Sequence, residues 1–138
     1  MVDSNVILRK IVSLEEYLQD LHDSKNLSFQ EFSSSKINRR YIERTLHMTI
    51  EACIDISNHI ISYDGFREPI SNKDTFQVLA EVNIISTILS EKLQKMAQFR
   101  NIIVHDYVKI QPEIVFSIVQ KNVVDIIDFV KIIKDKYI

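Results

Sequence analysis

The fold is decided by the stretch KINRRYIERTLHMTIEACIDISNHIISYDG, residues 36–65, which contains no proline and no glycine before its last residue. Gly65 is its first residue able to adopt a left-handed helix cap at no steric cost, so we expect one long helix over about residues 36–62. The whole 138-residue chain has one glycine and two prolines. With so few turn-forming residues, the chain is expected to form long helices joined by few loops.

A shorter amphipathic helix is expected before this stretch. It should begin after Asp3 or Ser4 as N-cap and end at residues 22–24. Apolar side chains recur along one side of it at helical spacing, at Ile7, Ile11, Leu14, Leu18 and Leu21. Between the two helices, Ser28 and Glu31 have the spacing of a capping box, which predicts one short helical turn.

Further helices are expected after the long one. Pro69 and Ser71 mark a loop and a new N-cap, so a short helix should occupy about residues 73–83. Ser86 is placed to cap a fourth helix, and Pro112 ends that segment and suits the start of a fifth. The stripe of the fourth helix is Leu89, Leu93, Met96, Arg100 and Ile103.

The fifth helix carries more apolar residues than one stripe requires. One face consists of Val115, Val119, Ile126, Val130, Ile133 and Tyr137. Its apolar surface is widened by Ile114, Ile118, Ile127 and Phe129. We therefore expect this helix to be buried on two sides. The chain as a whole is predicted to be all-α, an up-and-down bundle of four to five helices in one domain over residues 1–138.

Composition narrows the class of protein. A net charge of −2 and a pI of about 6.1 argue against a protein that coats nucleic acid, because such binding needs many phosphate contacts. The net charge and pI do not exclude a local basic groove. Cys53 is the single cysteine and cannot form an internal disulfide, and we recognise no signal peptide or membrane-spanning segment. We expect a cytoplasmic protein without membrane association.

The most informative motif is RNIIVHDY, residues 100–107. It brings the guanidinium of Arg100, the amide of Asn101 and the imidazole of His105 into one short segment. A cation that neutralises phosphate, beside a group that titrates near neutral pH, is the minimal equipment for metal-free phosphodiester cleavage. A structural explanation competes, because such pairs are common, Asn101 suits a helix end and Tyr107 suits a bundle edge.

Helical geometry limits how Arg100 and His105 act together. Five residues along a regular helix are separated by a net rotation of ~140° and a rise of ~7.5 Å. The two side chains would then point to different sides. Either the helix loosens before His105, or a second helix or subunit completes the site. We favour a homodimer in which two copies of the motif meet across a two-fold axis.

A polar stripe runs along the long helix. Its residues follow steps of three and four: Arg40, Arg44, His47, Glu51, Asp55, Asn58 and His59. Local ion pairs on a solvated face explain most of them. The start of this helix is basic, with four cations against one carboxylate: Lys36, Arg39, Arg40, Arg44 and Glu43. That end is suited to an RNA backbone, whereas Glu51 and Asp55 are better suited to orienting an arginine or a histidine.

The sequence does not support other kinds of site. The sequence has no Glu-x-x-His repeat and no His-Glu-x-x-His motif, so a metal site is not expected. A single glycine excludes a glycine-rich phosphate loop. Cys53 lies among apolar residues with no cation predicted nearby, so a reactive thiol is not expected either. We expect neither a metal nor a cofactor.

Residues 100–107 match the Arg-x4-His-x-Tyr pattern of a known family. The chain resembles the HEPN superfamily, specifically the HepT-like toxins of nucleotidyltransferase-paired toxin–antitoxin modules. Three upstream segments occur in the order of that family: residues 40–44, 51–59 and 76–80. The resemblance covers the chain from about residue 40 to its end.

The resemblance implies a homodimeric, metal-independent endoribonuclease with its cleft along the two-fold axis, acting on tRNA or mRNA. Arg100 would hold the scissile phosphate and stabilise the charge of the transition state. His105 would act as general acid or base while a ribose 2′-hydroxyl attacks, leaving a 2′,3′-cyclic phosphate. Asn101 would position the phosphate or the imidazole.

The resemblance also implies a partner, a small nucleotidyltransferase antitoxin of the MntA type that adenylylates Tyr107. Each added nucleotide would place an anionic phosphodiester beside the cleft and repel RNA phosphate. The alternative is a non-catalytic dimeric HEPN module that binds a nucleotidyltransferase or a nucleotide and leaves RNA intact. A plain helical assembly domain is the third possibility.

Overall fold

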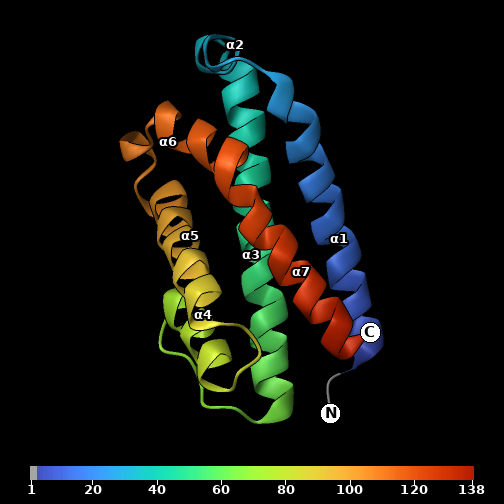
Figure 1. Ribbon diagram of the computed structural model, residues 1–138. Helices are drawn as coiled ribbons and strands as arrows, with labels where there is room; N and C mark the ends of the chain where they lie inside the picture. Colours follow the sequence, from blue (N-terminus) through green and yellow to red (C-terminus); the bar gives the residue numbers. More distant parts are fainter. Residues whose placement is uncertain (1–2) are drawn as a thin grey trace.

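The computed structural model describes residues 3–138, which are almost entirely helical (Figure 1). This confirms the predicted all-α class. The elements are α1 (Ser4–Asp23), η1 (Ser24–Asn26), α2 (Phe29–Ser34), α3 (Lys36–Asp64), α4 (Asn72–Glu81), α5 (Thr87–His105), η2 (Tyr107–Lys109), α6 (Pro112–Ser117), η3 (Ile118–Asn122) and α7 (Val123–Tyr137). The segments η1 and η2 are 3₁₀ turns, whereas η3 is a π-helical turn.

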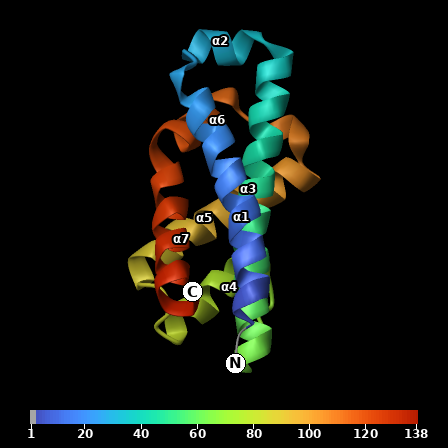
Figure 2. The ribbon, with the colours of Figure 1, turned by 90° about the vertical axis from the view of Figure 1, so that its right-hand side faces the viewer.

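The long helices α1, α3, α5 and α7 run alternately in opposite directions, which confirms the predicted up-and-down bundle (Figure 1). The short α2 connects α1 to α3 at one end, and α4 lies at the other end between α3 and α5 (Figure 2). The first and last helices are tied together, because the Ser4 hydroxyl donates to the Tyr137 carbonyl at 2.9 Å. Residues 105–112 lie at the opposite end, near α2 (Figure 1).

Side-chain caps set the N-terminal boundaries of α1 to α5. Asp3 accepts a hydrogen bond from the Asn5 amide, and Ser28 and Glu31 form the complete capping box. Helix α3 ends at Asp64, two residues beyond the predicted end, and Gly65 caps it at a φ of 71°, in the left-handed region. Helix α4 ends at Glu81, two residues earlier than predicted, and Asn83 follows at a φ of 61°.

The core is filled by the apolar stripes of the four long helices. In α1 the predicted stripe is buried at every position except Leu18, which is half-buried. The predicted face of α6 to α7 is buried from Val115 to Ile133. The wider apolar surface predicted for this segment is buried in part: Phe129 is 0% exposed, whereas Ile114 and Ile127 are 44% and 51% exposed. Helix α7 packs against α1 and α5, and this leaves the side bearing Ile127 in solvent.

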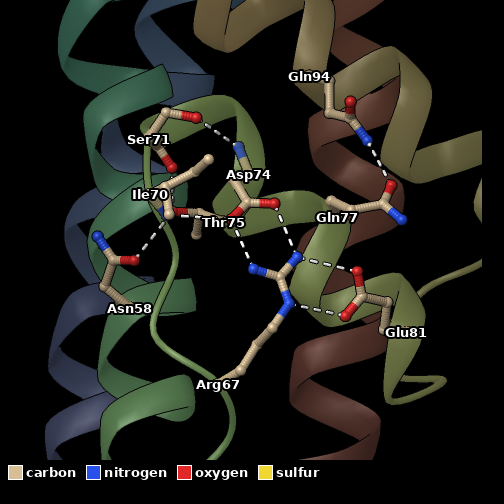
Figure 3. Close-up of polar contacts among 9 residues, drawn as sticks. All are labelled: Asn58, Arg67, Ile70, Ser71, Asp74, Thr75, Gln77, Glu81 and Gln94. Carbon is tan, nitrogen blue, oxygen red and sulfur yellow. Dashed lines mark hydrogen bonds and ion pairs between the residues drawn. The ribbon is translucent and has the colours of Figure 1, made fainter.

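An arginine clamp holds the loop between α3 and α4 (Figure 3). The Arg67 guanidinium donates to both carboxylate oxygens of Asp74, at 2.7 and 2.8 Å, and to both of Glu81, at 2.8 and 2.9 Å. Asp74 also accepts from the Ile70 amide. These bonds lower the pKa of Asp74 to about 2, with the Arg67 contribution the largest. The clamp fixes α4, whose Phe76 carbonyl accepts from Ser90 of α5.

The Arg67 clamp should make stability depend on pH. Because the folded pKa of Asp74 is depressed, its contribution is present above the ordinary value of 3.8 and is lost as pH falls through about 2. Arg67→Gln should therefore lower the melting temperature at pH 6, and the gap to wild type should narrow toward pH 2. Arg9→Gln, an exposed arginine on α1, is the control. A constant gap across this range would contradict the assignment.

Gly65→Ala should destabilise the bundle through backbone strain alone. A methyl group at Gly65 would meet no atom within 4 Å, so no steric clash adds to the cost of positive φ. We expect the free energy of unfolding to fall by about 1 kcal/mol in urea titrations. The matched control is Asn83→Gly, where relief of strain offsets the greater freedom of the unfolded chain, so a change below ~0.5 kcal/mol is expected.

Candidate functional site

Helix α5 remains regular up to His105, and the Asp106 amide still donates to the Ile102 carbonyl at 2.9 Å. The alternative in which the helix loosens before His105 is therefore wrong. Arg100 and His105 leave the helix at ~140° to each other. His105 is exposed, and its imidazole makes no hydrogen bond with residues 3–138. One subunit therefore does not bring both side chains to a single point.

Arg100 is held by α3. Its side chain is 19% exposed, and its Nε and Nη2 atoms contact Glu51 Oε1. The remaining Nη1 atom donates to Asn101 Oδ1 at 3.1 Å. Glu51 thus fixes the plane of the guanidinium, and Nη1 is left with only the neutral Asn101 side chain as its partner. Asp55, the other carboxylate expected to orient a cation, instead pairs with Lys10 of α1 at 2.6 Å.

His47 completes a small polar network around Glu51. Its Nε2 atom lies 3.5 Å from Glu51 Oε1, and its Nδ1 atom lies 3.3 Å from Arg44 Nη1. Because a guanidinium can only donate, Nδ1 accepts and the ring proton belongs on Nε2, facing Glu51. Burial lowers the pKa of His47, partly offset by Glu51. Burial and the acceptor role of Nδ1 therefore both favour a neutral imidazole.

These residues line a cavity of about 790 Å³ between α1, α3 and α5. Helix α3 contributes Arg44, His47, Glu51 and Asp55, α5 contributes Arg100, and α1 contributes Arg9 and Lys10. The two α1 cations are absent from the set of site residues predicted from sequence. In the sequence, these two cations are marked only by their place in a second stripe along α1. The stripe recurs at helical spacing, and all of its members line the cavity: Val6, Arg9, Lys10, Ser13 and Tyr17.

Tyr107 lies in a second cavity, of about 350 Å³. Its hydroxyl donates to Glu43 Oε1 at 2.8 Å. This bond raises the pKa of Tyr107, burial adds to the effect, and Arg40 and Arg39 oppose it. The polar residues of this cavity are Lys36, Arg39, Arg40, Glu43 and Tyr107. Sequence reasoning identified Arg40 and Tyr107 as site residues but did not connect them.

The structure therefore divides the predicted set of site residues. Arg44, Glu51 and Asp55 share the larger cavity with Arg100, and Asn101 contacts Arg100 from outside it. Arg40 belongs instead with Tyr107. Within residues 3–138, no group of three or more His, Cys, Asp or Glu side chains is arranged to hold a metal ion. In the same part of the chain, no helix is long and apolar enough to cross a membrane.

Comparison with known proteins gives consistent similarities. The family model described as Ribonuclease HepT-like matches residues 8–133. The mRNA nuclease HepT of Shewanella oneidensis is 33% identical over 131 residues, which cover 95% of this chain and 98% of that protein. The tRNA nuclease HepT of Aphanizomenon flos-aquae is 28% identical over 115 residues, or 83% of this chain and 78% of that protein.

A solved structure shows the same fold in an assembly. The tri-AMPylated Shewanella oneidensis HEPN toxin in complex with MNT antitoxin superposes with a TM-score of 0.88 at 32% identity. The match covers 99% of this chain and 100% of that one. With the family model spanning most of the sequence, these similarities show that the chain belongs to the HepT-like ribonuclease family.

Proposed function

We propose that this chain is the RNA-cleaving toxin of a toxin–antitoxin module, an endoribonuclease neutralised by a nucleotidyltransferase antitoxin. The observation that carries the proposal is its similarity over nearly the whole chain to the mRNA nuclease HepT of Shewanella oneidensis. The substrate class is mRNA or tRNA, after the two nuclease relatives, and the site of action is the cytoplasm.

Arg100 binds the scissile phosphate in this proposal. Glu51 occupies Nε and Nη2, so the Nη1 edge is the part of the guanidinium that reaches RNA, and phosphate replaces the Asn101 amide there. A guanidinium held in place before the reaction stabilises the developing negative charge without reorganising. Arg44, Arg9 and Lys10 around the same cavity provide further positive charge for the RNA backbone.

His105 moves the protons. A ribose 2′-oxygen attacks the adjacent phosphorus, the bond to the 5′-oxygen breaks, and a 2′,3′-cyclic phosphate remains. The imidazole takes the proton of the 2′-hydroxyl or gives one to the departing 5′-oxygen. Its exposure at the end of α5 supports this role, because no neighbouring group in residues 3–138 occupies either ring nitrogen.

A second copy of the chain completes the site. On one regular helix Arg100 and His105 diverge by ~140°, so Arg100 of one protomer works with a His105 supplied across a two-fold axis. The apolar side chains around the motif support an interface there. Ile102 and Val104 on α5 are 38% and 41% exposed, and Val108 is 90% exposed. Large exposed apolar groups of this kind favour a protein contact.

Arg100→Ala and His105→Ala should each reduce RNA cleavage by about 10²-fold or more in buffer containing EDTA. Cleavage of labelled tRNA and mRNA by the purified dimer measures this. Lys95→Ala is the control, since Lys95 is an exposed cation on the same helix. Full activity in both motif variants would refute the assignment, and RNA left intact by a wild-type chain that binds the antitoxin would favour the non-catalytic module.

Tyr107 is the residue that takes AMP in this proposal. Its side chain is accessible, with Tyr107 53% exposed, and a HEPN relative carries three AMP groups. After incubation with the antitoxin and Mg-ATP, mass spectrometry should find AMP additions on wild type and none on Tyr107→Phe, which should keep cleaving RNA. Tyr63→Phe, equally exposed at 53%, is the matched control. Loss of cleavage in wild type without any added AMP would indicate inhibition by steric binding.

A further inference from the structure

Glu43 is a buried carboxylate whose partner is the Tyr107 phenol. Glu43 is 7% exposed, and its Oε1 atom accepts the Tyr107 hydroxyl at 2.8 Å. A buried carboxylate is costly without hydrogen bonds or nearby cations, and here the Tyr107 hydroxyl supplies the hydrogen bond. The contact joins the third turn of α3 to η2, 64 residues further along the chain.

Three cations surround this contact. Lys36, Arg39 and Arg40 precede Glu43 by seven, four and three residues, which places all four side chains along one side of α3. They line the same 350 Å³ cavity as Tyr107. The Nε atom of Arg39 is buried and has no hydrogen-bond partner in residues 3–138. A cation with an unused donor beside an accessible phenol is suited to a phosphate group.

We propose that Glu43 accepts the phenol proton when Tyr107 takes an adenylyl group, and that Lys36, Arg39 and Arg40 bind the phosphate that arrives. The inference rests on the proposed function and adds an acceptor site within the toxin itself. The Tyr107 Oη–Pα bond forms, the bond from Pα to the pyrophosphate oxygen breaks, and the Oη proton moves to Glu43 Oε1. The nucleotidyltransferase supplies the nucleoside triphosphate and releases pyrophosphate.

The environment of Tyr107 explains why a proton acceptor is needed. The hydrogen bond to Glu43 and burial raise the pKa of the phenol, so almost none of it is ionised at neutral pH. A neutral phenol attacks phosphorus poorly unless its proton leaves during the reaction. Glu43 already lies at hydrogen-bond distance from that proton.

The product state follows from the same geometry. Once Oη is esterified it has no proton to donate, so Glu43 loses its hydrogen bond and faces a phosphodiester of like charge. The phosphate is repelled by Glu43 and attracted by Arg39 and Arg40, which line the same cavity. Modification then covers a basic surface at the start of α3 that would otherwise be open to an RNA backbone.

Glu43→Gln tests the proposal, because glutamine keeps an oxygen that accepts the Tyr107 hydroxyl but does not take its proton. In single-turnover assays with the nucleotidyltransferase partner and Mg-ATP at pH 7, AMP transfer should be about 10²-fold slower than in wild type. The deficit should shrink about tenfold per pH unit toward pH 9, because the phenolate that forms there needs no acceptor. Thermal unfolding of both proteins checks the fold.

A second variant tests the phosphate-binding side without altering a buried group. Arg40→Gln, at an exposed position, should slow AMP transfer about tenfold at every pH, and Lys95→Gln on α5 should leave it unchanged.

The outcomes separate the two proposals. Equal rates in wild type and Glu43→Gln at pH 7, or a deficit that does not vary with pH, would overturn the role of Glu43 and leave the proposed function standing. An unaltered rate in Arg40→Gln would overturn the phosphate site. Absence of AMP on wild-type Tyr107 would overturn the modification step of the proposed function, and this inference with it.

Discussion

The unbroken course of α3 is the constraint on which the other helices depend. Over 29 residues its buried side chains, from Ile42 to Ile61, face the core, and its polar side chains line both cavities. A kink would rotate the basic first turns away from the Glu51 region and separate Glu43 from Tyr107. The absence of proline and glycine within residues 36–64 therefore matters as much for the candidate site as for the fold.

The ion pair between Arg100 and Glu51 contributes more to the orientation of the guanidinium than to the stability of the fold. A half-buried carboxylate that takes two donors of a guanidinium loses some of its attraction to desolvation, so the net stabilisation of such a pair is small. The pair does fix the orientation of the guanidinium on a rigid helix. Glu51 also faces His47, whose Nε2 atom lies 3.5 Å from the same oxygen. One carboxylate therefore couples α3 to the motif helix and aligns two side chains of the larger cavity.

Local features were predictable from the sequence, and contacts between helices were not. Helix boundaries can be predicted at Ser28, Ser86 and Gly65, because capping depends on residues within one turn. The Arg67 clamp and the Glu43–Tyr107 bond join residues up to 64 positions apart, and no local spacing reports them. Periodicity likewise does not state which neighbours a helix has, so the apolar residues of α7 did not reveal that Phe129 is buried while Ile127 faces solvent. The family motif identified the site residues, but their division between two cavities required the fold.

The bond between Ser4 and Tyr137 places both ends of the described chain together, at the end of the bundle away from α2 and α6 (Figure 1). Dyes attached near these two residues would sit within energy-transfer range in the native protein and separate when the bundle opens. A surface tether at the same end would leave residues 105–112 facing outward. The architecture thus offers attachment points for single-molecule measurements that do not obstruct the reactive end.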